Sequence, residues 1–305
     1  MTGDPFGEQY EVPVAGGALA VARAGVPVDE AEAAVLAVHG VASSHVIWRT
    51  VARELTASSR VCMLAPDLRG RGRSARLPGP YGMAAHVADL LAVLDHAGAR
   101  QVVVVGHSLG AYVATGLAAR HPDRVSAVLL LDGGLAIPSY PDEIADELVE
   151  AMVDSALETA RLPFDSVEER VQQWRAHPAF ARDFSDDVEA YAGYDVADEN
   201  GTLRAAVSEA AVRADLAELV RSEPARAAID RIQAPLTFVR ARIPVQGTVS
   251  MVPQTLLDAF IASHPRATVD DVADANHYTL VLGAGPGPRR VAADIAAAIS
   301  EGVAI

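Results

Sequence analysis

Short apolar runs alternate with longer amphipathic stretches along this chain, and this alternation restricts its fold more than any other feature. The runs are rich in β-branched residues and apolar on both faces, like the strands of a parallel sheet that is covered on both sides. They lie at Ala34–Val38, Val61–Ala65, Gln101–Gly106, Val125–Leu131 and Leu236–Val239. Helical spacing of apolar residues follows at Val46–Ala57, Met83–His96 and Leu109–His121. The alternation predicts a doubly wound, mostly parallel α/β sheet.

Two further segments extend this pattern toward the ends of the chain. Glu8–Val14 and Ala18–Ala24 are expected to pair as an antiparallel hairpin at the edge of the sheet, around Gly16 and Gly17. A last helix is expected at Arg289–Ser300, after a loop rich in glycine and proline.

The alternation stops between residues 135 and 230. Helical patterns occur there at Asp142–Arg161, Val167–His177, Asp186–Tyr194 and Leu203–Leu219. We find no convincing strand in this segment, which holds 22 of the 40 acidic residues but 8 of the 25 basic residues. These changes predict a helical cap, residues 135–230, inserted after the sixth strand of a sheet domain that is formed by residues 1–134 and 231–305.

The pentapeptide Gly106-His107-Ser108-Leu109-Gly110 follows an apolar run directly and precedes a helical pattern. This is the G-x-S-x-G pattern in the strand–turn–helix context that a nucleophilic serine requires. The flanking glycines allow strand and helix to pack closely, and the turn exposes the hydroxyl at the carboxyl end of the sheet. We therefore predict that Ser108 is a nucleophile.

A serine hydroxyl needs a neighbouring base, because it is a weak nucleophile at neutral pH. His277 is the best of the nine histidines, since it follows the apolar segment Ala267–Val272 within a predicted loop, Ala273–Tyr278, late in the chain. That position agrees with the order serine, acid, histidine that is typical of such sites. The other histidines belong to backbone motifs or to helices.

The acid that orients the histidine is harder to find. In sites of this kind the acid usually follows the seventh strand, which here is Leu236–Val239. The residues after that strand, 240–248, contain no carboxylate. Asp132 is the best candidate, because it ends the sixth strand, Val125–Leu131, which we expect beside the seventh. Asp258 falls inside an apparent helix, and Asp274 is a reserve candidate only three residues before His277.

Two backbone N–H groups are expected to stabilise an oxyanion. One belongs to Leu109, at the start of the helix after Ser108, where the helix dipole also favours negative charge. The other belongs to Val41, because Gly40 lets the chain turn after the strand Ala34–Val38.

These motifs together resemble the α/β-hydrolase superfamily, and in particular its serine esterases and lactonases that carry a helical cap. The resemblance rests on His39-Gly40, on Asp67–Ser74 with its pattern D-x-R-G-x-G-x-S, on Gly106–Gly110 and on Asn276-His277. It implies an eight-stranded α/β-hydrolase fold, and some members of the superfamily carry the acid after strand six. The Gly-rich segment Asp67–Ser74 is expected to be structural.

The resemblance implies hydrolysis of a carboxylic ester or lactone of a small, fairly apolar substrate, through an acyl-enzyme on Ser108 and without cofactor or metal. Thioester hydrolysis and C–C bond hydrolysis use the same triad and stay open, as does a receptor that binds a ligand without turnover. The turn Gly106–Gly110 is called the elbow below. Epoxide hydrolases need an aspartate at the elbow, where this chain has Ser108.

Composition argues against several other classes of protein. The net charge of −15 disfavours binding to nucleic acid or to an anionic membrane surface. No apolar stretch reaches the roughly 20 residues that span a bilayer, and the acidic N-terminus lacks the features of a signal peptide. The single cysteine, Cys62, excludes a disulfide framework. A cytoplasmic protein that acts on a small molecule is expected, and its oligomeric state stays open.

Overall fold

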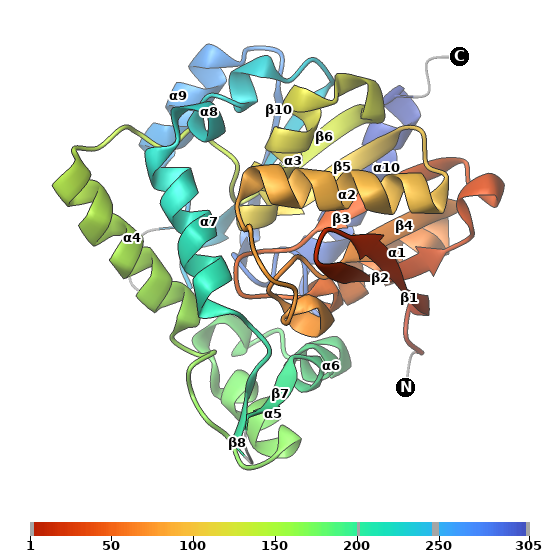
Figure 1. Ribbon diagram of the computed structural model, residues 1–305. Helices are drawn as coiled ribbons and strands as arrows, with labels where there is room; N and C mark the ends of the chain where they lie inside the picture. Colours follow the sequence, from red (N-terminus) through yellow and green to blue (C-terminus); the bar gives the residue numbers. More distant parts are fainter. Residues whose placement is uncertain (1–2, 200–201, 246–249, 303–305) are drawn as a thin grey trace.

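The computed structural model describes residues 3–199, 202–245 and 250–302. Its centre is an eight-stranded sheet with the strand order β1-β2-β4-β3-β5-β6-β9-β10 (Figure 1). The strands are β1 (Phe6–Val14), β2 (Gly17–Gly25), β3 (Ala33–Val38), β4 (Val61–Pro66), β5 (Val102–His107), β6 (Val125–Leu131), β9 (Leu236–Ile243) and β10 (Thr268–Asn276). β2 runs antiparallel to β1 and to β4, and all other neighbours are parallel. The structure confirms the predicted α/β sheet and its N-terminal hairpin.

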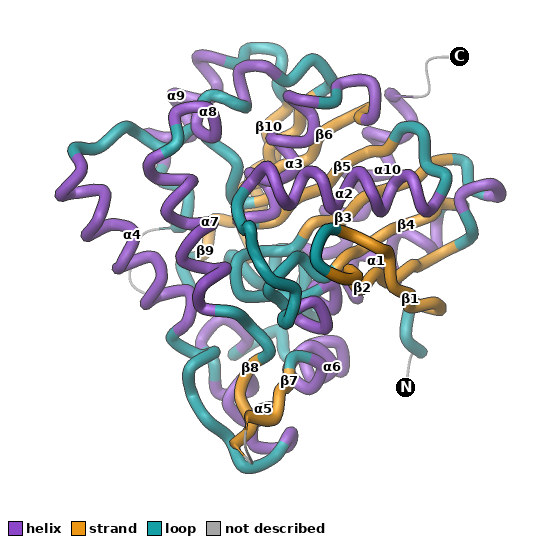
Figure 2. Tube along the Cα trace, viewed as in Figure 1, coloured by secondary structure: helices purple, strands orange, loops and turns teal. Residues whose placement is uncertain are grey.

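Helices cover both faces of the sheet, so that each apolar strand is buried on both sides (Figure 2). One face carries α2 (Met83–Ala97), α3 (Leu109–Arg120) and α9 (Gln254–Ser263), and the other carries α1 (Arg49–Ser58) and α10 (Gly287–Gly302). Alternate residues of β5 enter different cores, Val104 on the first face and Val105 on the second. Among the described residues, no helix is both long and apolar enough to cross a bilayer.

Residues 135–230, which lie between β6 and β9, are called the insert below. Its helices are α4 (Asp142–Leu157), α5 (Val167–Ala176), α6 (Asp186–Tyr194), α7 (Glu209–Arg221) and α8 (Glu223–Arg226). In Figure 1, α4 and α7 lie at one side of the sheet, and α5 and α6 lie below it. Apolar residues of α4 and α7 join the core on the α2–α3 face, whereas those of α5 and α6 join the core on the α1–α10 face. The insert thus extends both cores.

Two predictions for the insert are wrong. β7 (Val196–Glu199) and β8 (Thr202–Ala205) pair antiparallel in the segment that was expected to contain no strand. Strands of four residues are too short to give a clear alternation of apolar and polar positions. β8 also occupies the start of the helix predicted at Leu203–Leu219, and α7 begins only at Glu209, after the capping side chain of Ser208.

β9 and β10 are longer than their apolar runs predict. β9 continues past Val239 to Ile243, and β10 includes residues 273–276, which were expected to lie in a loop. The two strands pair with each other as far as Asn276 and Ile243. Pairing along the backbone extends both strands through polar residues that carry no strand signal of their own. As a result, His277 directly follows the end of β10.

Candidate active site

Ser108 lies in the turn between β5 and α3, in a strained backbone conformation with φ of +56° and ψ of −120°. Such a conformation costs a non-glycine residue about 1–3 kcal/mol and is most often found at functional sites. The turn is also tight, because a Cβ atom at Gly106 would lie 2.2 Å from the carbonyl oxygen of Gly110. Ser108 is half-buried. The strand–turn–helix context therefore presents this serine at the carboxyl end of the sheet, where open α/β folds bind ligands.

Asp132 and His277 are joined by a short hydrogen bond. Asp132 directly follows β6 with φ of +49°. Its Oδ2 accepts a hydrogen bond of 2.7 Å from His277 Nδ1, and its Oδ1 accepts one of 3.3 Å from the N–H of Ala241 in β9. The Asp132 side chain is only 1% exposed. Because Nδ1 donates to the carboxylate, Nε2 of His277 carries the lone pair that a general base needs.

Contacts at the strand ends hold this pair close to the elbow. The N–H of Ser108 donates to the carbonyl oxygen of Leu131 at 3.0 Å. Gly133 packs on the elbow so closely that a Cβ atom there would lie 2.4 Å from the carbonyl oxygen of Ser108. On the other side, Nε2 of His107 donates to the carbonyl oxygen of His277 at 2.8 Å. These contacts hold Ser108, Asp132 and His277 at the same edge of the sheet, where the parallel strands end.

His107 was assigned only to the backbone motif, and its contact with His277 was missed. The two residues are 170 positions apart in the chain, so no local pattern reveals the contact. Burial and the charge of His277 lower the pKa of His107 well below its ordinary value. A neutral His107 places no second positive charge beside an imidazolium at His277.

The other two candidate acids lie elsewhere. Asp258 is exposed on α9 and accepts a 2.8 Å hydrogen bond from Gln254. Asp274 is exposed on β10, whereas Nδ1 of His277 is already bound by Asp132. Part of the carboxylate-free segment after β9, residues 246–249, lies outside the described residues.

The loop after β3 holds the expected second oxyanion donor. Gly40 lies against the elbow, since a Cβ atom there would be 3.2 Å from the Cβ of Ser108. Nε2 of His39 accepts from the N–H of Leu68 at 2.8 Å, so Nδ1 is the donor to the Gly40 carbonyl oxygen, also at 2.8 Å. Burial lowers the pKa of His39 to about 4, which keeps this ring neutral. The N–H of Val41 belongs to the same peptide unit as that carbonyl and points in the opposite direction.

Leu109 is the first residue of α3. The N–H groups in the first turn of a helix have no partner within the helix, and the positive end of its dipole lies there. Leu109 is adjacent to Ser108 in the chain. Its N–H group therefore lies beside the serine, and Gly40, the residue before Val41, packs against Ser108.

The segment Asp67–Ser74 supports the site structurally, as expected. Asp67 is fully buried and accepts hydrogen bonds from the N–H of His45 at 2.7 Å, from His45 Nδ1 at 2.9 Å and from the Tyr194 hydroxyl at 2.7 Å. Burial alone would raise the pKa of Asp67, but the charge and hydrogen bonds of His45 outweigh this and hold it at about 2. The bond from Tyr194 also ties α6 of the insert to this segment.

Aromatic rings of the insert pack against the loop that carries His277. Tyr278 lies 5.8 Å from Trp174 and 5.6 Å from His177, measured between ring centroids. Nearby, the hydroxyl of Tyr191 donates to Ser43, in the loop after β3, at 3.2 Å. Trp174 and Tyr191 are buried in this cluster, while Tyr278 is only half-buried.

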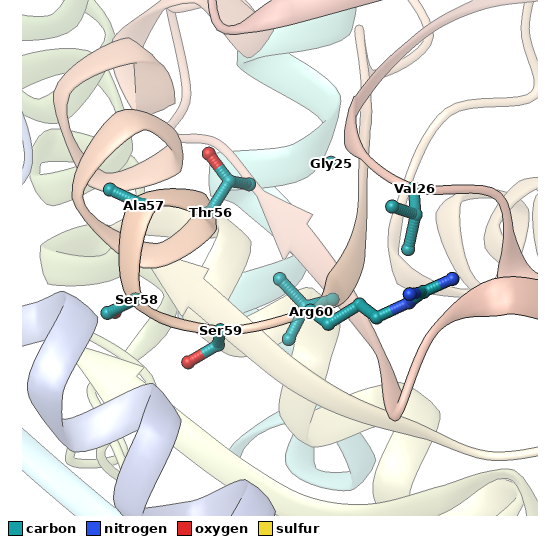
Figure 3. Close-up of a pocket in the computed structure, with 8 residues that line it drawn as sticks. Gly25, Val26, Thr56, Ala57, Ser58, Ser59 and Arg60 are labelled. Atoms are coloured by element: carbon teal, nitrogen blue, oxygen red, sulfur yellow. The ribbon is translucent and has the colours of Figure 1, made fainter.

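A surface hollow of about 340 Å³ lies far from these residues (Figure 3). It is lined by the end of β2, the end of α1 and the start of β4, including Gly25, Thr56 and Arg60. The start of β4 is at the edge of the sheet opposite to the carboxyl ends of the parallel strands, where Ser108 lies. This hollow is not part of the candidate active site.

Comparison with known proteins identifies the family to which this fold belongs. Residues 33–283 match the family model for the alpha/beta hydrolase fold. Over 123 residues the chain is 42% identical to lipase LipV of Mycobacterium tuberculosis, which covers 40% of this chain and 44% of that protein. Over 114 residues it is 38% identical to epoxide hydrolase B of the same species, covering 37% of this chain and 31% of that protein. The matched regions thus span less than half the length of these relatives.

A solved structure extends the likeness of fold over nearly the whole chain. The thioesterase domain from the curacin biosynthetic pathway superposes with a TM-score of 0.75 at 20% identity, covering 95% of this chain and 99% of that one. The family model itself spans the elbow at Ser108, the end of β6 at Asp132 and the loop at His277. The chain belongs to the alpha/beta hydrolase fold family.

Proposed function

We propose that this protein is a serine hydrolase that cleaves a carboxylic ester or a lactone through an acyl-enzyme. The observation that carries the proposal is the 2.7 Å hydrogen bond between Asp132 and His277, held beside an elbow serine at φ of +56°. A triad is recognised by such geometry and roles rather than by sequence position. The names of two relatives, a lipase and an epoxide hydrolase, support hydrolysis as the class of reaction.

In the first half of the proposed reaction, Oγ of Ser108 bonds to the carbonyl carbon while Nε2 of His277 takes up its proton. Asp132 stabilises the resulting imidazolium and keeps the ring in the correct tautomer. The N–H groups of Val41 and Leu109 stabilise the oxyanion. His277 then gives the proton to the leaving alkoxide, and the acyl group stays on Ser108.

In the second half, a water molecule attacks the acyl carbon and gives its proton to His277. Collapse of this second tetrahedral intermediate breaks the bond to Ser108, which recovers the proton from His277. The carboxylic acid leaves, and the enzyme is restored. In a lactone the leaving alkoxide and the acid belong to one molecule, so the product is a hydroxy acid.

We propose that the insert acts as the cap of this site, and that residues 1–134 and 231–305 form the catalytic domain. The aromatic cluster around Trp174 and Tyr278 and the hydrogen bond from Tyr191 to Ser43 support this arrangement. The half-buried Ser108 and the aromatic rings around His277 and Tyr278 favour a small, fairly apolar substrate. The proposed reaction uses no cofactor. The serine at the elbow disfavours epoxide hydrolysis, for which the family resemblance implies an aspartate.

The proposal is tested with p-nitrophenyl esters, matched lactones and thioesters, and a fluorophosphonate probe. We expect turnover of the oxygen esters or lactones, and labelling of Ser108 by the probe. Ser108→Ala should lower kcat by about 10³-fold or more, leaving the contributions of binding and of the oxyanion donors. Labelling that persists in the alanine variant would move the nucleophile elsewhere. A single burst without steady-state turnover would identify a receptor that retains its ligand.

A further inference from the structure

Arg71 and Asp215 form an ion pair that connects the sheet domain to the insert. Arg71 belongs to the Gly-rich segment after β4, and Asp215 lies on α7, whose middle turn approaches the start of α2 (Figure 1). Nη1 of Arg71 is 2.6 Å from Oδ2 of Asp215, and both side chains are completely inaccessible to solvent. A buried ion pair is weak evidence for a role in stability, because the cost of removing two charges from water opposes their attraction.

Arg71 also donates hydrogen bonds to backbone carbonyl groups near the elbow. Its Nε donates to the carbonyl oxygen of Val41 at 2.7 Å, and its Nη1 donates to the carbonyl oxygen of Arg69 at 2.9 Å. The bond to Val41 is directed at the residue whose N–H group is the proposed oxyanion donor. With Gly40 already held by His39, both peptide units that flank the Cα atom of Val41 are anchored.

Asp215 is itself fixed by the sheet domain. Its Oδ1 accepts from the N–H of Gly82 at 2.8 Å, and its Oδ2 accepts from Nε2 of His86 at 2.9 Å. Burial opposes ionisation of Asp215, but the charges and hydrogen bonds of Arg71 and His86 hold its pKa below the ordinary value. The neighbouring Glu218 accepts from the N–H of Met83 at 2.9 Å. α7 is therefore seated on the first turn of α2, with a carboxylate that faces Arg71.

We propose that Arg71 is a positioning residue for the oxyanion donor at Val41, and that the insert supplies Asp215 to hold Arg71 in place. The inference rests on the proposed function, because it assigns a role within that site. Neither residue touches the substrate. Residues 39–44, which include Val41, are called the oxyanion loop. Through this pair, the position of α7 on α2 determines the conformation of the oxyanion loop. The loop therefore has its catalytic conformation only when the insert is docked on the sheet domain.

The same segment offers a matched control. Arg69 forms a second buried pair, with Asp89, through hydrogen bonds of 2.9 and 2.7 Å. Its remaining donors bind the carbonyl oxygens of Ala15 and Pro78, away from the oxyanion loop. Breaking this second pair leaves a buried arginine without its carboxylate, as in the first case, but does not touch the contact with Val41.

The kinetic test compares Asp215→Asn and Arg71→Met with Asp89→Asn and Arg69→Met. We expect the first two variants to lower kcat by at least about tenfold, less than the loss of a whole oxyanion donor, with KM changed much less. The double variant Arg71→Met with Asp215→Asn should lose no more kcat than Arg71→Met alone, because the two residues act as one unit. The control variants should lower the melting temperature to a similar extent while leaving kcat within about twofold.

A second measurement does not depend on turnover. Amide hydrogen exchange should become faster in residues 39–44 of Asp215→Asn, and should stay unchanged there in Asp89→Asn. Equal losses of kcat in both sets of variants, or unchanged exchange in residues 39–44, would overturn the proposed role of the pair. Failure of the proposed function would give a different result. In that case Ser108→Ala would keep its activity, whatever the activity of the Arg71 variants. Asp215→Asn is the milder change and serves if Arg71→Met does not fold.

Discussion

At the scale of single residues, the position of Asp132 follows from the order of the strands. β6 and β9 are direct neighbours, and Asp132 donates its own N–H to the carbonyl oxygen of Val239 in β9 at 2.9 Å. Its side chain can therefore reach His277, which follows β10 on the far side of β9. The left-handed backbone at Asp132, with φ of +49°, turns the carboxylate into the site. A residue held in such a conformation is consistent with a functional role.

Replacing Asp132 tests this assignment directly. Asp132→Asn keeps the size of the side chain but loses the charge that stabilises the imidazolium of His277. We expect kcat to fall by about 10²–10⁴-fold with a much smaller change in KM. The measurement is steady-state kinetics on an ester, with melting temperatures to show that the variant is folded.

Asp274→Asn is the matched control for this prediction, because Asp274 is exposed on β10, close to His277 in sequence. It should cost less than about tenfold in kcat, which corresponds to ~1.4 kcal/mol of barrier. A severe loss in Asp274→Asn, with Asp132→Asn still active, would place the acid in the strand before the histidine.

The sequence points to the candidate catalytic residues more readily than to the residues that are proposed to position them. Ser108 is identifiable because the elbow is a local pattern. Asp132 is identifiable because no carboxylate follows the apolar run Leu236–Val239, which is part of β9. Arg71 gives no comparable signal. Its role depends on Asp215, on a helix of the insert, and on Val41, and only the folded structure brings these three segments together.

At the scale of secondary structure, local patterns predict the buried strands and the helices that pack on them. β6 has the predicted bounds, since Val125–Leu131 is buried almost throughout. The prediction fails where pairing rather than burial creates the strand, as in the hairpin of β7 and β8 and in the polar ends of β9 and β10. Their residues gain order from backbone hydrogen bonds, which no side-chain periodicity records.

The junction between α6 and β7 contains a buried carboxyl group that makes stability depend on pH. Burial and the charge of Asp67 raise the pKa of Asp195 to about 8, against the opposing charge of Arg170. An unfolded aspartate has a pKa of about 3.9. The folded state therefore binds the proton more tightly, and the stability that this provides is lost as the pH rises from about 4 to about 8.

Asp195→Asn should remove this dependence, because an amide resembles the protonated carboxyl group at every pH. Between about pH 5 and pH 9 we expect the melting temperature of the wild type to fall more than that of the variant, by at least about 2 °C. Differential scanning calorimetry at several pH values measures the difference. Asp258→Asn, on the exposed face of α9, should follow the wild type. Parallel curves for the wild type and Asp195→Asn would contradict a raised pKa.

At the scale of the whole molecule, several buried or half-buried contacts hold the insert on the sheet domain. Besides Asp215, Asp187 of α6 accepts from Arg53 at 2.7 Å and from Thr50 at 3.0 Å, both on α1. Asn276, at the end of β10, donates to the carbonyl oxygen of Ala179 in the insert at 2.7 Å. The insert is thus attached to α1, to the start of α2 and to the end of β10, which supports the proposed cap over the candidate site.

The charge of the molecule is divided very unequally between its two parts. The insert contains 22 acidic residues and 8 arginines, out of 40 acidic and 25 basic residues in the whole chain. Nearly all of the net charge of −15 therefore belongs to the insert. The electric field of such an acidic surface repels anions over a distance that depends on the salt concentration. A negatively charged substrate should therefore approach the site more slowly than a neutral one.

Two esters of similar shape, p-nitrophenyl valerate and the carboxylate-bearing p-nitrophenyl glutarate, test this repulsion. Raising the salt concentration from about 0.01 M to 0.1 M shortens the screening length from about 30 Å to about 10 Å. The value of kcat/KM should then rise severalfold for the anionic ester and stay nearly constant for the neutral ester. Replacing the exposed Asp142, Glu143 and Glu147 of α4 by their amides should reduce the response of the anionic ester. An equal response of both esters would show that salt acts on the enzyme itself, and that the acidic surface does not select against anions.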